Sequence, residues 1–376
     1  MGQPDSHIVT GADADSNPQE VARPARAIKG RGTANKVDPR YLENTREVFD
    51  DGWERAGEGR PVRTTVTVEH PKTIISRNES PDIPFDASIN PYRGCEHGCP
   101  YCYARPSHAY MDLSPGIDFE TRLFAKPDAA KLLKEELGKP GYICTPIALG
   151  TNTDPYQPIE RDFRITRQII ETLNACNHPL TIVTKSRGVE RDIDLLAAMA
   201  ARNLTQVFIS VTTLDHELAR KLEPRATAPQ SRLETLKRLH AAGIPAGVMF
   251  APVIPALNDT EMEAVLTAAA GAGVQHAGYV MLRLPYEVKV LFREWLNTHY
   301  PLKTEHVMNM VKDIRGGREN DPNFGSRMRG QGVYADIIAR RFHKTCHDLG
   351  LNKKHVELDT ARFIAPVLTG DQLKLF

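Results

Sequence analysis

The sequence predicts an α/β protein built on parallel strands, and three observations support this class. Short apolar stretches alternate with longer segments of helical periodicity over most of the chain. Six strands can be counted, each followed by a helical segment, and this alternation favours parallel pairing with right-handed crossovers. Charged residues make up 25% and hydrophobic residues 41% of the 376 residues, as in an ordinary globular protein. Six units are fewer than the eight of a closed barrel.

The N-terminal region precedes this alternation. Residues 1–35 are polar with no apolar period, so we expect a disordered tail. Residues 36–85 are expected to form an extension that packs on the main domain, partly through Tyr41–Trp53. Thr64–Glu69 alternates Thr and Val and predicts a strand, and Thr73–Arg77 is expected to pair with it.

The main domain is expected between residues 86 and 300. The strands are predicted at Asp86–Asn90, Tyr142–Leu149, Leu180–Thr184, Gln206–Val211, Ala246–Phe250 and Gly278–Leu282. The helices are predicted at Asp128–Leu137, Arg161–Ala175, Val189–Ala201, Gln230–Ala242, Glu261–Ala270 and Val288–Thr298. Catalytic residues of such folds lie at the C-terminal ends of the strands.

The most distinctive stretch follows the first of these strands. Cys95, Cys99 and Cys102 have the spacing C-x3-C-x2-C, and no fourth cysteine follows. Structural zinc sites and ordinary cubane clusters use four protein ligands. Three cysteines therefore predict a [4Fe–4S] cluster with three irons held by the protein and one iron open to a small molecule. Gly94 and Gly98 suit a loop that wraps tightly.

Two other uses of this loop stay open from the residues alone. His97 could complete a four-ligand zinc site, although zinc ligands rarely interleave so closely. The chain would then be a zinc-stabilised nucleic-acid-binding module, whereas a non-catalytic iron–sulfur electron carrier is the other alternative. The N-terminus has no signal-peptide pattern, and the apolar runs are too short to span a bilayer. These features and the need for reduced thiols favour a cytoplasmic protein without membrane contact.

The cysteine spacing resembles the radical S-adenosylmethionine (SAM) superfamily. Thr153–Glu160, Leu222–Leu233 and Met249–Asp259 resemble its spore photoproduct lyase-like branch, also labelled DNA-repair photolyase-like. The resemblance implies a partial (β/α)6 TIM-type barrel, with N-terminal and C-terminal extensions, a [4Fe–4S] cluster and bound SAM. It also implies a flavodoxin- or ferredoxin-type reductant. The implied reaction is reductive cleavage of SAM to a 5′-deoxyadenosyl radical, which abstracts a hydrogen atom from a substrate.

The same resemblance implies five SAM contacts after successive strands. Tyr101 is expected near the adenine, and Thr153 and Asp154 near the amino group, because a carboxylate can pair with an ammonium group. Lys185 is a suitable counter-ion for the SAM carboxylate, and Ser210 is expected to face the ribose or methionine part. The ordinary alternatives are a turn, an exposed loop lysine and a strand serine.

The catalytic residue and the substrate are not predicted. In spore photoproduct lyase a further cysteine donates a hydrogen atom to the repaired dinucleotide. Neither Cys144, Cys176 nor Cys346 can be matched to that donor. The choice among DNA, RNA and peptide substrates, and between a lyase and a transferase, therefore stays open.

The C-terminal extension, residues 301–376, contains an arginine- and glycine-rich stretch at residues 313–334. Arginines can bind phosphates while aromatic rings such as those of Phe324 and Tyr334 stack on bases. The arginines predicted to contact nucleic acid are Arg315, Arg318, Arg327 and Arg329. A solvated or cofactor-covering loop is the alternative interpretation, because the net charge of the chain is only +1.

Overall fold

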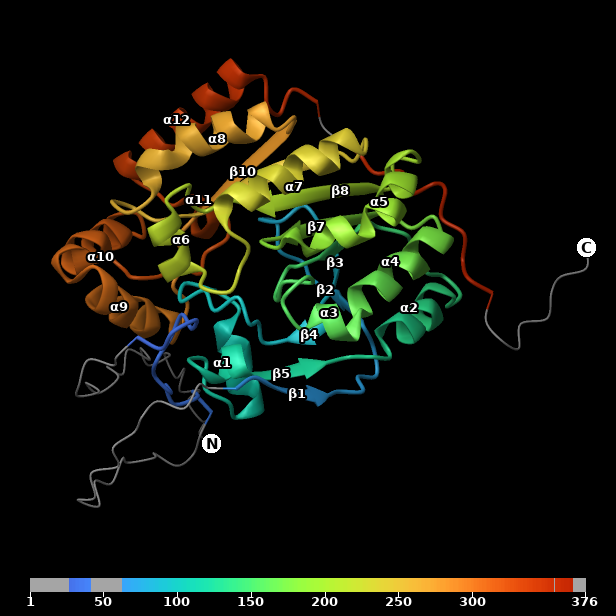
Figure 1. The fold of residues 1–376 in the computed structure, drawn as a ribbon, viewed down its shortest axis with the longest axis horizontal. Helices are drawn as coiled ribbons and strands as arrows, with labels where there is room; N and C mark the ends of the chain where they lie inside the picture. Colours follow the sequence, from blue (N-terminus) through green and yellow to red (C-terminus); the bar gives the residue numbers. More distant parts are fainter. Residues whose placement is uncertain (1–26, 42–62, 355, 368–376) are drawn as a thin grey trace, which may run out of the picture.

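A seven-stranded sheet forms the centre of the fold in this computed structural model, which describes residues 27–41, 63–354 and 356–367 (Figure 1). The strands are β2 (Ile75–Arg77), β3 (Ala87–Ile89), β6 (Ile147–Leu149), β7 (Leu180–Thr184), β8 (Thr205–Ser210), β9 (Ala246–Val253) and β10 (His276–Met281). Six of them, from β3 to β10, are parallel and adjacent in chain order, whereas β2 pairs antiparallel with β3. Because β2 and β10 are the two edges, the sheet does not close, and the predicted partial barrel is confirmed.

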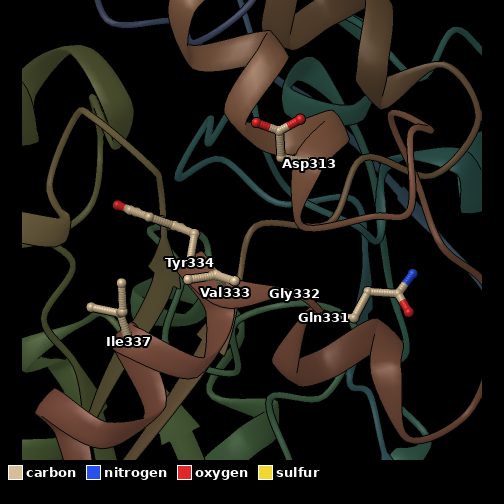
Figure 2. A pocket seen from close by; sticks show the side chains of 6 residues that line it. All are labelled: Asp313, Gln331, Gly332, Val333, Tyr334 and Ile337. Atoms are coloured by element: carbon tan, nitrogen blue, oxygen red, sulfur yellow. The ribbon is translucent and has the colours of Figure 1, made fainter.

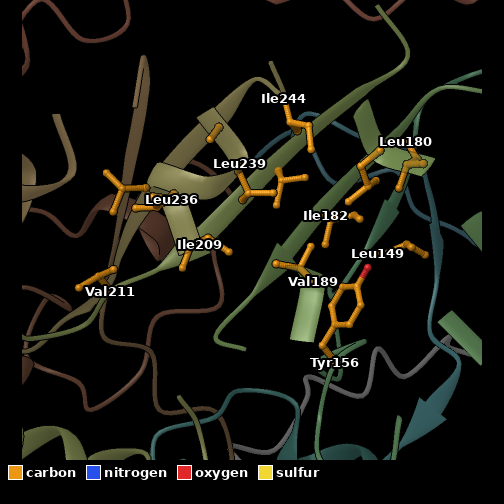
Figure 3. Packing of buried hydrophobic residues seen from close by; sticks show 14 of the residues in the cluster. Leu149, Tyr156, Leu180, Ile182, Val189, Ile209, Val211, Leu236, Leu239 and Ile244 are labelled. Carbon is orange, nitrogen blue, oxygen red and sulfur yellow. The ribbon is translucent and has the colours of Figure 1, made fainter. Parts of the chain in front are cut away.

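Amphipathic helices cover the sheet between successive strands (Figure 1). They are α2 (Ala129–Leu137), α4 (Ile165–Ala175), α5 (Ile193–Ala200), α7 (Pro229–Ala241) and α8 (Met262–Gly271). Helix α4 shows how an amphipathic helix covers the sheet. Its apolar residues Ile165, Ile169 and Leu173 recur at helical spacing and are buried. Strand residues Ile182 and Ile209 meet helix residues such as Leu236 in one apolar layer (Figure 3).

The remaining helices lie outside this repeat. They are α1 (Asp118–Thr121), α3 (Glu160–Phe163), α6 (His216–Leu222), α9 (Val288–His299), α10 (Thr304–Asp313), α11 (Ser326–Arg329) and α12 (Val333–Leu349). In the described ranges, 3-10 turns lie at Arg105–Met111, Arg187–Asp192, Asp259–Glu261 and Pro301–Lys303. Helix α12 packs against α8. Among the described residues, no helix combines the length and the apolar character that crossing a bilayer requires.

The predicted pairing of the first two strands is wrong. Strand β1 (Thr65–Val68) pairs in parallel with β5 (Arg122–Ala125), and β4 (Tyr92–Arg93) completes a separate three-stranded sheet. Strand β5 offers a fully buried Leu123 to this sheet, whereas β2 instead extends the main sheet beside β3. The sequence predicts a local hairpin, but β1 pairs instead with a strand more than fifty residues away, because that strand has an apolar face to bury.

Several predicted elements differ in extent, and three of these differences have a visible cause. The predicted strand at Tyr142–Leu149 is shortened to β6, because Ile143 is exposed and Pro146 has no N–H to donate. The predicted helix at Arg161–Ala175 is interrupted at Arg164, which has a φ of 52°. The helix predicted from Val189 starts as a 3-10 turn before α5.

Part of the predicted N-terminal tail is bound to the domain. Gly32 and Thr33 donate backbone hydrogen bonds of 3.0 and 3.1 Å to the carboxylate of buried Glu120. The expectation of a disordered tail is therefore corrected at this point, because a buried carboxylate requires donors and these amides supply them. Residues 1–26, and the predicted Tyr41–Trp53 segment beyond Tyr41, lie outside the described residues.

Candidate functional site

The cysteine loop lies between β4 and the 3-10 turn at Arg105–Met111, beside the C-terminal ends of the parallel strands. Asn90, one residue after β3, connects it to the next strand end, because its side-chain oxygen accepts from the amides of Asn152 (3.0 Å) and Thr153 (3.3 Å). The first two predicted site segments therefore lie next to each other.

The three predicted metal ligands are free thiols. Cys95 and Cys99 are buried and Cys102 is half-buried. Burial raises the pKa of all three thiols, to about 12 for Cys99. Thiolates are therefore unstable in this environment unless a cation compensates their charge, and bound metal supplies such a cation. The donor set fits a thiolate-ligated iron–sulfur cluster.

The two glycines of the loop are required by its shape. Gly94 has a φ of 73° and Gly98 a φ of 71°, which is the left-handed region that favours glycine. A Cβ at Gly94 would lie 2.8 Å from the carbonyl oxygen of Phe119, and one at Gly98 would lie 2.9 Å from a carboxylate oxygen of Glu120. The loop is therefore held against the chain segment that follows it.

A buried ion pair holds the cysteine loop in place, and it was not predicted from the sequence. Arg105 donates to the carbonyl of Cys99 at 2.8 Å and to the carboxylate of Glu120 at 2.6 Å. It also donates to the carbonyls of Pro115 and Gly116. Both members of the Arg105–Glu120 pair are fully buried. No local pattern signals such a role, because the partners come from separate segments.

The arrangement does not favour His97 as a zinc ligand. His97 is buried, and its Nδ1 lies 3.4 Å from a carboxylate oxygen of Asp154. Within the described part of the chain, no three His, Cys, Asp or Glu side chains converge on one ion position. A mononuclear zinc site requires such convergence, whereas the cysteines of a cubane bind three different irons.

Thr153 and Asp154 are engaged in internal hydrogen bonds. The Thr153 hydroxyl donates to the carbonyl of Tyr92 at 3.1 Å. Asp154 accepts from the hydroxyl of Thr184 and the amide of Lys185, both at 2.7 Å. These bonds join the ends of β6 and β7 and fix the backbone of Lys185.

Tyr101 and Lys185 meet in a buried network around Glu223. The hydroxyls of Tyr101 and Thr212 and the guanidinium of Arg232 all donate to the Glu223 carboxylate. Lys185 Nζ lies 3.7 Å from Glu223 and 6.0 Å from the centroid of the Tyr101 ring. Burial alone would raise the pKa of Glu223, but Arg232 and Lys185 lower it to about 2. The network therefore holds a buried carboxylate in its charged form beside the cysteine loop.

Ser210 completes the set of predicted contacts. It is the last residue of β8 and is buried, and its carbonyl accepts from Arg232 at 2.8 Å. Sequence reasoning missed Glu223, although the Leu222–Leu233 stretch had drawn attention to that segment. Arg225, by contrast, pairs with Glu96 at 3.1 Å.

The arginine- and glycine-rich stretch does not present all four predicted nucleic-acid contacts. Arg315 is buried, and it donates to the carbonyls of Met281 and Leu282 at the end of β10. Arg327 is paired with Asp82. The prediction for Arg315 is therefore wrong, because its guanidinium satisfies backbone carbonyls. Arg318 and Arg329 are exposed.

A hollow lies beside this stretch, between the end of α10 and the first turn of α12 (Figure 2). Its lining residues are Asp313, Gln331, Gly332, Val333, Tyr334 and Ile337. None of them is a predicted cluster or SAM residue, so this hollow is separate from the predicted site.

Comparisons with known proteins cover the part of the chain that contains these residues. A family model described as the radical SAM superfamily matches residues 89–269, which include the cysteine loop and the Glu223 network. An uncharacterized protein of Mycobacterium tuberculosis (strain ATCC 25618 / H37Rv) is 36% identical over 298 residues, covering 77% of this chain and 86% of that protein. A protein of Methanocaldococcus jannaschii is 30% identical over 173 residues, covering 46% of this chain and 62% of that protein.

Solved structures share the fold. Spore photoproduct lyase complexed with dinucleoside spore photoproduct has a TM-score of 0.56 at 16% identity, covering 76% of this chain and 80% of that chain. A mutant of the same lyase with bound AdoMet and the dinucleoside gives the same values. At this identity the likeness shows a common fold. Taken with the family match and the mycobacterial relative, it leads to the conclusion that this chain belongs to the radical SAM superfamily.

Proposed function

We propose that this chain is an enzyme that uses SAM and a three-cysteine [4Fe–4S] cluster to abstract a hydrogen atom from a substrate. The observation that carries the proposal is the placement of three free thiols, two of them buried, beside the Tyr101–Lys185–Glu223 network. Neither a zinc module nor a passive electron carrier would require a charged, hydrogen-bonded network beside its cysteines.

The cluster would be held by Cys95, Cys99 and Cys102. When bound, the reduced cluster and SAM supply the 5′-deoxyadenosyl radical, and the protein contributes binding, orientation and exclusion of water. Burial of the thiols serves the last of these tasks, since Cys95 and Cys99 are each 8% exposed.

The proposed SAM contacts divide into two groups. Tyr101, Lys185 and Ser210 are proposed as direct contacts, with the Lys185 ammonium group serving as counter-ion to the carboxylate of SAM. Glu223 orients Tyr101 and Lys185 through the contacts described above. Thr153 and Asp154 are proposed to position the loop, because their polar atoms are already hydrogen-bonded within the protein.

The proposed partners are a reductant and a nucleic-acid substrate. A flavodoxin or ferredoxin would supply the electron. The dinucleoside bound by spore photoproduct lyase makes nucleic acid the first substrate to test, and the exposed Arg318 and Arg329 are compatible with a phosphate-bearing ligand.

The test is an assay of anaerobically reconstituted protein. Protein with bound iron and sulfide is reduced in the presence of SAM, and 5′-deoxyadenosine is measured with deuterated single-stranded DNA, RNA or cell extract added. Release of 5′-deoxyadenosine and transfer of deuterium into it are expected. Iron-loaded protein that never releases 5′-deoxyadenosine would instead support the electron carrier, and tetrahedral zinc at the cysteines would support the zinc module.

A further inference from the structure

One guanidinium at the end of β10 is less satisfied than its neighbours. Arg283 follows the strand by two residues and is half-buried. Its Nε is buried and has no hydrogen-bond partner among the described residues. Its Nη1 reaches only the sulfur of Met328, at 3.4 Å, and a thioether is a weak acceptor. Nearby Arg315, by contrast, donates to four backbone carbonyls.

The charges around Arg283 do not neutralise it. Asp82 accepts from the amide of Gly325 at 2.6 Å and from Arg327. Asp321 accepts from the hydroxyl of Ser326 and from a backbone amide. Both carboxylates are thus used by other groups, and within the described ranges no acidic side chain forms an ion pair with Arg283. Burial and the charge of Arg327 lower the pKa of Arg283, as expected for a cation without a counter-ion.

An open aromatic ring lies beside this cation. The Arg283 guanidinium carbon is 5.6 Å from the centroid of the Tyr103 ring, and Tyr103 is 50% exposed. The Tyr103 hydroxyl donates to the carbonyl of Thr151, which holds the ring in place. Tyr103 directly follows Cys102 in the chain, so the pair lies next to the cysteine loop.

We propose that Arg283 and Tyr103 form a substrate subsite for single-stranded nucleic acid. Arg283 binds a phosphate through its unpaired donors, and Tyr103 stacks on an adjacent base. This inference rests on the proposed function and names the substrate class of that site. An acidic peptide would satisfy Arg283 but would leave the exposed ring unused, so the pairing of cation and ring favours a nucleotide.

The subsite can be tested with two matched probes. One is a fluorescein-labelled oligothymidylate with ordinary phosphodiesters, and the other has the same sequence with uncharged methylphosphonate linkages. Binding to the reconstituted full-length chain is measured by fluorescence anisotropy. Wild type is expected to prefer the phosphodiester probe. Arg283→Gln is expected to weaken that binding by roughly tenfold or more, while binding of the neutral probe stays unchanged.

Three further variants separate this contact from general effects of charge or folding. Arg122→Gln removes the same charge at an exposed position outside the proposed nucleic-acid contacts and is expected to change binding by less than about twofold. Arg283→Lys keeps the charge without the planar fork and is expected to bind with intermediate affinity. Tyr103→Leu is expected to weaken binding of both probes, because stacking does not depend on the phosphate.

Several results would overturn the subsite. They are a wild type that binds neither probe or binds both equally, an Arg283→Gln variant that binds like Arg122→Gln, and polyglutamate that displaces the phosphodiester probe at equal charge concentration. SAM cleavage without oligonucleotide is measured in parallel. If Arg283→Gln has no effect on binding but 5′-deoxyadenosine is still released, the subsite fails alone. If wild type releases no 5′-deoxyadenosine, the proposed function fails whatever the probes show.

Discussion

The cysteine loop and the arginine- and glycine-rich stretch at residues 313–334 both have sequences that predict ligand binding. They differ in how far their side chains are engaged within the protein. In the loop, Cys95, Cys99 and Cys102 remain free thiols. In the stretch, Arg315 and Arg327 are used to build the protein itself. A guanidinium has five donors that backbone carbonyls and carboxylates can satisfy, whereas a buried thiol gains little from either. Side-chain chemistry therefore decides which of two glycine-rich segments keeps its side chains for a ligand.

The largest expected effect is loss of the cofactor from the loop without loss of the fold. Cys99→Ala removes a sulfur ligand but few packing atoms, so two cysteines remain and the cluster is not retained. Iron content and 5′-deoxyadenosine release should both fall to background, with the circular dichroism spectrum unchanged. Cys144→Ala, outside the loop, is the control and should retain both. Normal iron content and SAM cleavage in Cys99→Ala would remove the basis of the assignment.

A substitution in the Glu223 network should lower both the stability of the protein and its affinity for SAM. Glu223→Gln leaves buried Arg232 without its counter-charge, which is expected to cost about 3 kcal/mol of unfolding free energy and to weaken SAM binding. Because the pKa of Glu223 is lowered from 4.5 to about 2, its stabilisation is present above pH 4.5 and is lost as the pH falls toward 2. Urea unfolding at several pH values measures this difference. A variant with unchanged stability at pH 7 would contradict the network's role.

Arg315→Met should have the opposite profile to Cys99→Ala. Its guanidinium joins the carbonyls of Met281 and Leu282 to those of Ser326 and Arg327, and the substitution removes all four of these hydrogen bonds. We expect a loss of about 2 kcal/mol in urea unfolding, with iron content after reconstitution unchanged. The exposed Arg318→Met serves as the reference. If Arg315→Met instead lost nucleic-acid binding at full stability, the original prediction for this arginine would be restored.

A smaller effect is expected from a substitution at Gly32, which packs against the cysteine loop at Gly98. A Cβ at Gly32 would lie 1.5 Å from the carbonyl oxygen of Gly98, so Gly32→Ala must displace the N-terminal segment or the loop. We expect a loss of about 1–3 kcal/mol and faster loss of iron in air. Gly271→Ala, at a helical position with nothing within 4 Å of the added Cβ, is the control. Equal stability and equal iron loss in the two variants would show that the chain around Gly32 can move to accept a Cβ without cost.

The sequence predicts some parts of this molecule well because their cause is local. Strand β7 has the predicted limits, since a buried run of β-branched and apolar residues defines Leu180–Thr184. The cysteine ligands are recognised from their spacing. The pairing of β1 with β5 and the destination of Arg315 could not be predicted, because each depends on partners far along the chain. Arg315 and the carbonyl of Met281 are 34 residues apart, and no spacing rule links them.

The smallest expected effect concerns the contact between the arginine- and glycine-rich stretch and the loop that connects β2 to β3. Arg327 pairs with Asp82, which precedes β3, and donates to the hydroxyl of Ser80. Arg327→Gln should free the part of the stretch around residue 327 without a change in global unfolding, because Arg315 still holds the remainder. Limited proteolysis should then cut this stretch several times faster than in Arg329→Gln, which changes an exposed arginine of the same stretch. Equal cleavage rates would mean that Arg315 alone holds the stretch and that the Arg327–Asp82 pair does not protect it from proteolysis.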